Sequence, residues 1–319
     1  MLLRICVYSA RPAFYHVGMV DSTAPPANTG LHDRRRAAAI PPHVFFVISA
    51  VFHYLGPAFA VLLFAQLSVL GVAWLRIASA ALVFAVWRRP WRLIMDATWN
   101  QRRDLIALGV VLGAMNSCFY LALARLPLGT VGAIEFLGPL SLAALGLRSR
   151  RNLFALGLAA VGGWLLTNVQ MVSEPLGLAL AFANCLLFVF YIVLGHRLAG
   201  DGAAAGVDRL GAAMLIALVV VTPLGVLGAT PAIRRPDLLL AGVGVGICSS
   251  VIPYVCDQLA MARLPRASFA LLLALLPATA VAVGVIVLRQ IPSAIELGGM
   301  TLIIAGIAVH RPASDAEHS

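Results

Sequence analysis

The chain is built from long apolar stretches separated by short polar segments. Each stretch is about 18–22 residues long, the length that an α-helix needs to cross a hydrocarbon core about 30 Å thick. The apolar residues run continuously and do not alternate with polar ones, which excludes the strands of an outer-membrane barrel. The pattern predicts ten transmembrane helices, at residues 44–65, 69–87, 104–124, 128–147, 152–170, 177–197, 210–229, 238–259, 267–288 and 293–310.

The second half of this pattern repeats the first at an offset of 138 residues. The letters ARLP occur at Ala124–Pro127 and again at Ala262–Pro265, and at the same offset Pro139 corresponds to Pro277. Five spans in each half reverse the second half relative to the first. Secondary transporters use such inverted repeats to build alternating access. We therefore expect an all-α membrane protein of ten transmembrane helices in two inverted five-helix repeats.

The repeats divide the chain into four parts. The first repeat covers residues 44–170 and the second covers residues 177–310. Residues 1–43 include a polar segment rich in Pro and small residues, so we expect a disordered cytoplasmic tail there. Its start is open, because the sequence is compatible with initiation at Met1 or at Met19. Residues 311–319 form a short cytoplasmic tail in this interpretation.

The charge content supports a membrane location and gives an orientation. Of the 319 residues 61% are hydrophobic and only 11% are charged, against roughly 25% in a soluble domain. All 23 basic residues are Arg, and the net charge is +10. The arginines stand in short clusters between apolar runs, which is typical of cytoplasmic loops and not of a nucleic-acid surface. Their bias predicts an inner (plasma) membrane protein with both termini in the cytoplasm.

Among the charged residues that fall inside predicted spans, we single out Arg76, Glu135 and Asp257. A charge at the centre of a bilayer costs about 2.5–3.5 kcal/mol on insertion scales, so such residues usually serve a function. Arg76 can bind substrate or form a buried structural ion pair. Glu135, flanked by uncharged residues on both sides, is the strongest candidate for a site. Asp257 lies closer to the predicted cytoplasmic end of its span, where water can reach it.

Uncharged polar residues recur at helical spacing on the same spans. Asn116 and Tyr120 lie four apart, as do Tyr254 and Gln258, and the offset of 138 pairs Asn116 with Tyr254 and Tyr120 with Gln258. Residues at this spacing share one helix face, so both repeats present polar groups at equivalent depth. We expect them to line one central cavity, although packing roles stay open for the tyrosines.

Two further observations concern the first and sixth spans. His53 adjoins Gly56–Pro57, where we expect a local break in the helix, and it either lines the cavity or packs as a hydrogen-bonded side chain. Asn184 and Tyr191 lie seven residues apart within the span at 177–197.

The sequence indicates no cofactor and no metal. The five cysteines include no C-x-x-C pair, and the seven histidines are scattered. There is no H-E-x-x-H and no G-x-S-x-G motif, which argues against an intramembrane enzyme. A carboxylate removed from water binds a proton more tightly. Glu135 can therefore couple proton movement to substrate movement without a cofactor or a metal ion.

Two stretches resemble a known family. GAMNSCFYLALARLPLGTVGAIEFLGPL (113–140) and IPYVCDQLAMARLP (252–265) are similar to the EamA-type drug/metabolite transporters, and within them to the amino-acid exporters. The resemblance implies a ten-helix inverted-repeat transporter that exports small metabolites through a central site, with proton exchange. Arg76, Asn116, Tyr120 and Glu135 match the family's pattern in the first half.

The second half departs from the family's pattern. The family often has a Glu directly before the proline of the ninth span, where this chain has Leu276. It often has Gly-Glu after that span, where this chain has Arg289–Gln290. The roles of those two carboxylates therefore do not carry over.

The sequence thus predicts a proton-linked exporter of threonine- or homoserine-like amino acids, with lipid, protons and a small-molecule substrate as its partners and no nucleic acid. Glu135 would carry the proton or bind the substrate ammonium, and Arg76 would bind its carboxylate. A carrier of drugs or lipid-linked metabolites with the same fold is one alternative, and an intramembrane enzyme is another. The exact substrate, the coupling ion and a homodimer stay open.

Overall fold

The computed structural model describes residues 41–146, 150–171, 173–197, 203–261 and 275–309. Within these residues all regular structure is helical. The predicted tails lie almost wholly outside the described residues, as does the second ARLP segment. The helices are α3 (Pro42–Leu63), α4 (Val69–Arg88), α5 (Trp91–Asp96), α6 (Trp99–Leu123), α7 (Leu128–Gly146), α8 (Arg150–Met171), α9 (Pro175–Arg197), α10 (Ala203–Arg234), α11 (Pro236–Gly246), the π-helix η1 (Ile247–Val251), α12 (Ile252–Met261), α14 (Leu275–Leu288) and α15 (Ala294–Val309).

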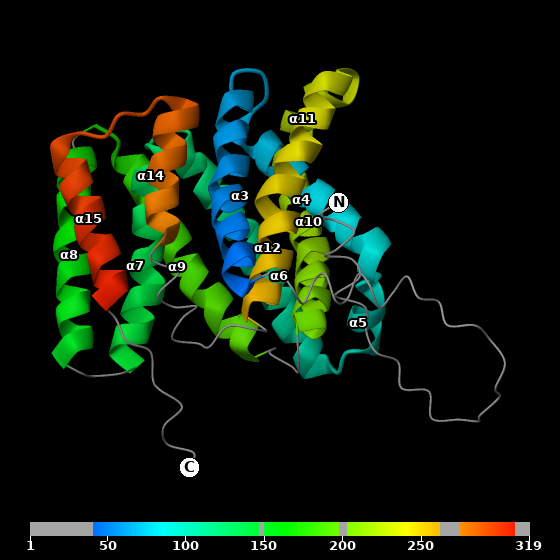
Figure 1. The fold of residues 1–319 in the computed structure, drawn as a ribbon. Helices are drawn as coiled ribbons and strands as arrows, with labels where there is room; N and C mark the ends of the chain where they lie inside the picture. The colour runs from blue at the N-terminus through cyan, green and yellow to red at the C-terminus, as the bar shows by residue number, and fades with distance from the viewer. Residues whose placement is uncertain (1–40, 147–149, 172, 198–202, 262–274, 310–319) are drawn as a thin grey trace, which may run out of the picture.

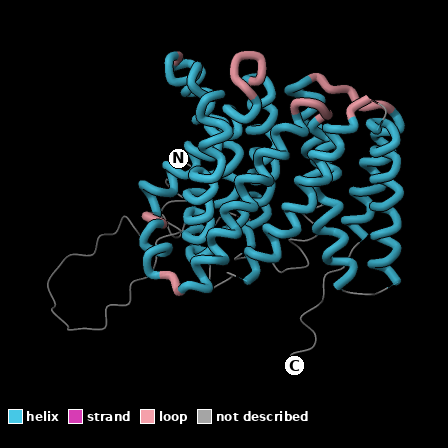
Figure 2. The backbone as a smooth tube through the Cα atoms, turned by 180° about the vertical axis from the view of Figure 1, so that it is seen from behind, coloured by secondary structure: helices cyan, strands magenta, loops and turns pink. Residues whose placement is uncertain are grey.

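The long helices stand side by side in one bundle (Figures 1 and 2). The pair α8 and α15 forms one edge, and α10 packs against α4 and α6 toward the other edge. Helix α3 lies between α12 and α14, while α7 contacts α9 and α14. Helices α11 and α12 are joined end to end by η1. Segments from both ends of the chain therefore meet in the middle of the bundle.

Six helical segments of the described chain are long and apolar enough to cross a membrane. They correspond to α3, α4, α6, α9, α10 and the segment Pro236–Asp257 that runs from α11 into α12. Three shorter apolar helical segments lie at Leu128–Ser141, Leu276–Leu288 and Ala294–Val309. The protein is therefore a multi-pass membrane protein, and every described helix except α5 overlaps a predicted apolar stretch.

Helices α4, α6 and α15 begin after residues whose side chains satisfy free backbone N–H groups of the first turn. The hydroxyl of Ser68 accepts from Gly71 N at 3.1 Å before α4. Thr98 and Gln101 form a capping box before α6, with each side chain bonded to the other's backbone. Ser293 and Glu296 do the same before α15.

Close packing of the two edge pairs depends on glycine. A Cβ on Gly162 would come within 2.5 Å of the carbonyl oxygen of Gly299, and one on Gly299 within 2.9 Å of that of Gly162. In the same way, a Cβ added to Gly225 of α10 would lie 2.6 Å from Trp74 Cβ of α4. Small residues let helix backbones approach in a bilayer, where no hydrophobic force drives them together.

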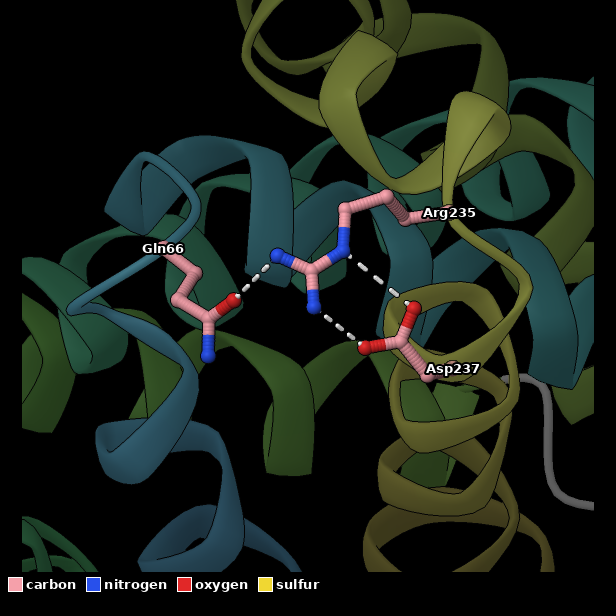
Figure 3. Close-up of polar contacts among 3 residues, drawn as sticks. All are labelled: Gln66, Arg235 and Asp237. Carbon is pink, nitrogen blue, oxygen red and sulfur yellow. Dashed lines mark hydrogen bonds and ion pairs between the residues drawn. The ribbon is translucent and has the colours of Figure 1, made fainter.

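Polar contacts tie the bundle at both ends. At the end that holds α5, Arg88 of α4 forms a bidentate ion pair with Asp208 of α10, with distances of 2.6 and 2.9 Å. At the opposite end, Arg235 bonds Asp237 through two nitrogens and donates to Gln66 Oε1 at 2.9 Å (Figure 3). This second contact joins the α3–α4 loop to the start of α11.

The predicted break at Gly56–Pro57 is wrong, because α3 is continuous from Pro42 to Leu63 with Pro57 inside it. Proline removes one backbone donor but does not end a helix when neighbouring helices hold it. Gly56 instead permits a close contact, since a Cβ there would lie 2.5 Å from Ser249 Cβ. The irregular segment is η1 on the facing helix, which contains Ser249.

Candidate functional site

A cavity lies in the middle of the bundle, between α3, α4, α6, α7, α9 and α12. The space that the centre of a water-sized sphere can occupy within it is about 40 Å³, which is room for a few water molecules. Its polar wall is formed by His53, Arg76, Asn116, Glu135, Asn184, Tyr191 and Tyr254. Its apolar wall is formed by Met115, Phe119 and Phe188.

Arg76 of α4 is held by η1. The side chain is 4% exposed, and its Nε donates to Ser250 Oγ at 2.9 Å while Nη2 donates to the carbonyl oxygen of Ser249 at 3.1 Å. The ring of Tyr120 lies under the guanidinium, 5.4 Å from Cζ to the ring centroid. Within the described residues Nη1 donates no hydrogen bond. The guanidinium is therefore fixed on one side and open on the other.

Glu135 lies two turns into α7 and is 5% exposed. Its Oε1 accepts a hydrogen bond from Nδ2 of Asn184 on α9 at 3.2 Å. Its Oε2 is buried and has no hydrogen-bond partner in the described residues. Because buried acceptors are nearly always bonded, a carboxylate oxygen in this state is a binding site for a donor or a proton.

The two charges of the cavity are not paired with each other. Among the described residues no carboxylate oxygen lies within 4.0 Å of the guanidinium nitrogens of Arg76. Arg76 and Glu135 are still close enough to interact electrostatically. The arrangement presents one positive and one negative group to the same enclosed space, and it can accept a molecule that carries both charges.

Five of the eight predicted site residues line this cavity: His53, Arg76, Asn116, Glu135 and Tyr254. The amide of Asn116 donates to Leu112 O of its own helix at 2.8 Å, which fixes its position in the wall. The ring of His53 stands edge-on to Tyr54, with ring centroids 5.1 Å apart.

Two of the other three predicted residues do not line the cavity, and the third lies outside the described side chains. Tyr120 is fully buried behind Arg76 and does not line the cavity. Asp257 is half-buried on α12, one turn after Tyr254, and does not line it either. The side chain of Gln258 lies outside the described residues.

The two positions that depart from the family's pattern are occupied by residues with visible packing roles. Leu276 is buried at the start of α14. Gln290 follows α14, and its Oε1 accepts from the backbone N of Leu128 at 2.9 Å. Leu128 is the first residue of α7, so Gln290 caps the helix that carries Glu135.

Asn184 is the cavity residue with the clearest contact that the sequence did not select. In the sequence it is only an amide in an apolar run, at helical spacing from Tyr191. Its partner Glu135 lies 49 residues away on another helix, and no periodicity connects the two. Across the described residues, no three His, Cys, Asp or Glu side chains come together in a group that could hold a metal ion.

Comparison with known proteins places these features among transporters. A model of the EamA-like transporter family matches residues 175–310. The threonine/homoserine exporter RhtA of Escherichia coli K12 is 34% identical over 253 residues, which cover 78% of this chain and 84% of the exporter. RhtA of Salmonella typhimurium SL1344 is 33% identical, again over 78% of this chain and 84% of the exporter. A protein of known crystal structure is 19% identical in sequence to this chain. The two structures superpose over 83% of this chain and 96% of the other, with a TM-score of 0.52, which shows similarity of fold alone.

Proposed function

Because this chain belongs to the EamA-like transporter family, we propose that it exports small zwitterionic metabolites, of the threonine and homoserine type, across the inner membrane in exchange for protons. The observation that carries the proposal is the pair of unlike charges, Arg76 and Glu135, that line one cavity without pairing with each other. The transport of small metabolites follows from the family, and the substrate and coupling are the proposal.

An amino acid matches this cavity in charge. Its carboxylate can accept from the open side of the Arg76 guanidinium, whose planar donors suit a carboxylate. Its ammonium can donate to Oε2 of Glu135, the carboxylate oxygen that has no partner in the described chain. The side chain then faces the apolar wall at Met115, Phe119 and Phe188.

Proton exchange follows from the same carboxylate. The Glu135 carboxyl is buried among protein atoms, so either a proton or a cation can serve as its partner there. An arriving ammonium favours the ionised form, because opposite charges attract more strongly in a low dielectric. Glu135 therefore binds either a proton or the substrate, and this exclusion couples their movements. Asp257 stays outside the proposed proton site because it does not line the cavity.

Alternating access requires two halves that move against each other, and the helix contacts support the inverted repeat. The first half is α3, α4, α6, α7 and α8, and the second is α9, α10, α11–α12, α14 and α15. Equivalent helices pack together in the pairs α4–α10, α7–α14 and α8–α15. The contact of α6 with α9 matches that of α12 with α3, and the contact of α7 with α9 matches that of α14 with α3. Exchanging the two halves reproduces these contacts, as a twofold repeat requires.

The arginines support the orientation with cytoplasmic termini. Around α5, at one end of the bundle, stand Arg88, Arg89, Arg92, Arg102 and Arg103. Arg150 and Arg151 begin α8 at the same end. The opposite end has Arg125, Arg234, Arg235 and Arg289. Loops rich in Arg stay in the cytoplasm, so the end with α5 would face inward.

An export screen tests the proposed substrate class. The intact chain, expressed in bacteria that are inhibited by excess homoserine, threonine or toxic amino-acid analogues, should relieve the inhibition and raise the amino acid in the medium. Cells with an empty vector provide the control. Resistance to hydrophobic drugs alone, with no amino acid exported, would overturn the proposal in favour of the drug-carrier alternative.

A further inference from the structure

The surroundings of Glu135 contain a second buried acceptor that the proposed transport cycle does not use. The Oδ1 atom of Asn184 has no hydrogen-bond partner in the described residues, and the side chain is fully buried. Asn184 lines the same cavity as Glu135. The hydroxyls of Tyr54 and Tyr120 are also without a partner there, but neither tyrosine lines the cavity.

The hydrogen bond between Asn184 and Glu135 fixes the direction of the amide. Nδ2 donates to Oε1 at 3.2 Å, and it keeps this direction when Glu135 is ionised beside a bound ammonium, because an amide oxygen in that place would repel the carboxylate. With Nδ2 and Oε1 bonded to each other, Oδ1 of Asn184 and Oε2 of Glu135 are the two acceptors left. They belong to side chains of adjacent helices, α9 and α7, that are in direct contact.

Helices α7 and α9 pack closely beside this pair. Gly138, one turn after Glu135 on α7, lies so close to α9 that a Cβ there would meet Cys185 O at 2.9 Å and Cys185 Sγ at 3.0 Å. Cys185 follows Asn184 in the chain and does not line the cavity. The close approach of α7 and α9 at Gly138 therefore brings the backbone of Asn184 near that of Glu135, where their side chains can share one ligand.

Two buried acceptors on adjacent side chains are satisfied together by a ligand that offers at least two donors there. A primary ammonium has three donors and one positive charge, so it satisfies both acceptors and the carboxylate charge together. An N,N-dimethylated ammonium has one donor and leaves one acceptor without a partner. A hydroxyl group in the same place has one donor and no charge.

We propose that Asn184 is a specificity-determining residue, whose Oδ1 binds the substrate's ammonium together with Oε2 of Glu135 and selects primary amines over N-alkylated ones. This inference rests on the proposed function, since it concerns the ammonium end of a transported zwitterion. It adds a second ligand to that end, contributed by the second half of the chain, while Glu135 comes from the first.

The test is counterflow of labelled homoserine into proteoliposomes that contain the purified full-length protein. Unlabelled homoserine and its N,N-dimethyl derivative serve as competitors. Asn184→Leu removes the amide at similar volume, and Asn184→Ser keeps a small acceptor in case the leucine variant does not fold. Cys185→Ala is the matched control, because it alters the neighbouring residue of α9 and the contact with Gly138 but leaves the amide in place.

The wild type and Cys185→Ala should prefer homoserine over its dimethyl derivative. In Asn184→Leu the KM for homoserine should rise roughly ten- to a hundred-fold, the effect of losing a hydrogen bond to a charged group, while the maximal rate changes little. The ratio of apparent affinities for homoserine and its dimethyl derivative should fall toward one, because Glu135 alone needs only one donor. Asn184→Ser should show a KM and a preference between those of the wild type and Asn184→Leu.

An unchanged preference in both Asn184 variants, or a loss of rate with the preference intact, would overturn the inference while leaving the proposed function standing. Absence of counterflow for every amino acid in the wild-type protein would instead overturn the proposed function, and this inference with it.

Discussion

Arg76 and Glu135 are held in the cavity by different kinds of partner. Two donors of the guanidinium bond to Ser249 and Ser250, and the rest of the group faces the cavity. Glu135 has a single amide partner and one free oxygen. The positive group is thus anchored at two points of its planar fork, while the negative group keeps one oxygen without a partner in the described residues.

Replacing Arg76 by Lys tests whether the planar geometry of the guanidinium matters. A Lys ammonium keeps the charge but cannot bond to both serines and still present two parallel donors to a carboxylate. We expect Arg76→Lys to raise the KM for homoserine roughly ten- to a hundred-fold in counterflow, as for the loss of one charged hydrogen bond. Ser250→Ala, which removes only one anchor, should have a smaller effect. Wild-type kinetics in Arg76→Lys would contradict this role.

The depth of these charges could be predicted from the sequence, but their partners could not. An ionisable residue inside an apolar run is visible in one dimension, so the sequence alone identifies Arg76 and Glu135. Their hydrogen bonds join residues 174 and 49 positions apart in the chain. Such contacts depend on how helices pack, and a single sequence contains no periodicity that records them.

At the scale of elements, the segment α11–η1–α12 is where the sequence was least informative. The apolar run at 238–259 predicts one helix, and the structure has a π-helix within it at Ile247–Val251. Such bulges are often found at functional sites, because one inserted residue changes the direction of the backbone groups. Here the bulge contains both serines that bind Arg76. The apolar pattern does not predict the short helix α5 either, since it is too short to produce an apolar span.

The position of α7 depends on a cap supplied by Gln290. Gln290→Leu removes the acceptor for Leu128 N, and loss of a helix cap costs about 0.5–2 kcal/mol. We expect a lower thermal unfolding temperature in detergent and slower counterflow, because α7 carries Glu135. Gln290→Glu keeps an acceptor at the same distance and should resemble the wild type in both measurements. Equal stability of the leucine variant and the wild type would show that the cap is dispensable.

At the scale of the molecule, the membrane location and the helical fold follow from composition and apolar length alone. The ten-helix inverted repeat is a stronger claim, and it is supported by the offset of 138 residues and by helix contacts that match between the halves. The two halves are not equal at the site. Glu135 comes from the first half, and the second half contributes Asn184, Tyr191 and Tyr254. In the proposed cycle, the first half would therefore carry the Glu135 charge, and polar groups of the second half would contact it.

Glu135 is the residue proposed to couple proton movement to substrate movement. The direct measurement is amino-acid efflux from proteoliposomes driven by an imposed pH gradient, with Glu135→Gln as the variant and Asp257→Asn as the control carboxylate outside the cavity. Glutamine keeps the size and an acceptor for Asn184 but cannot ionise, so gradient-driven efflux should be abolished in Glu135→Gln and largely retained in Asp257→Asn. Unchanged gradient-driven efflux in Glu135→Gln would contradict the account.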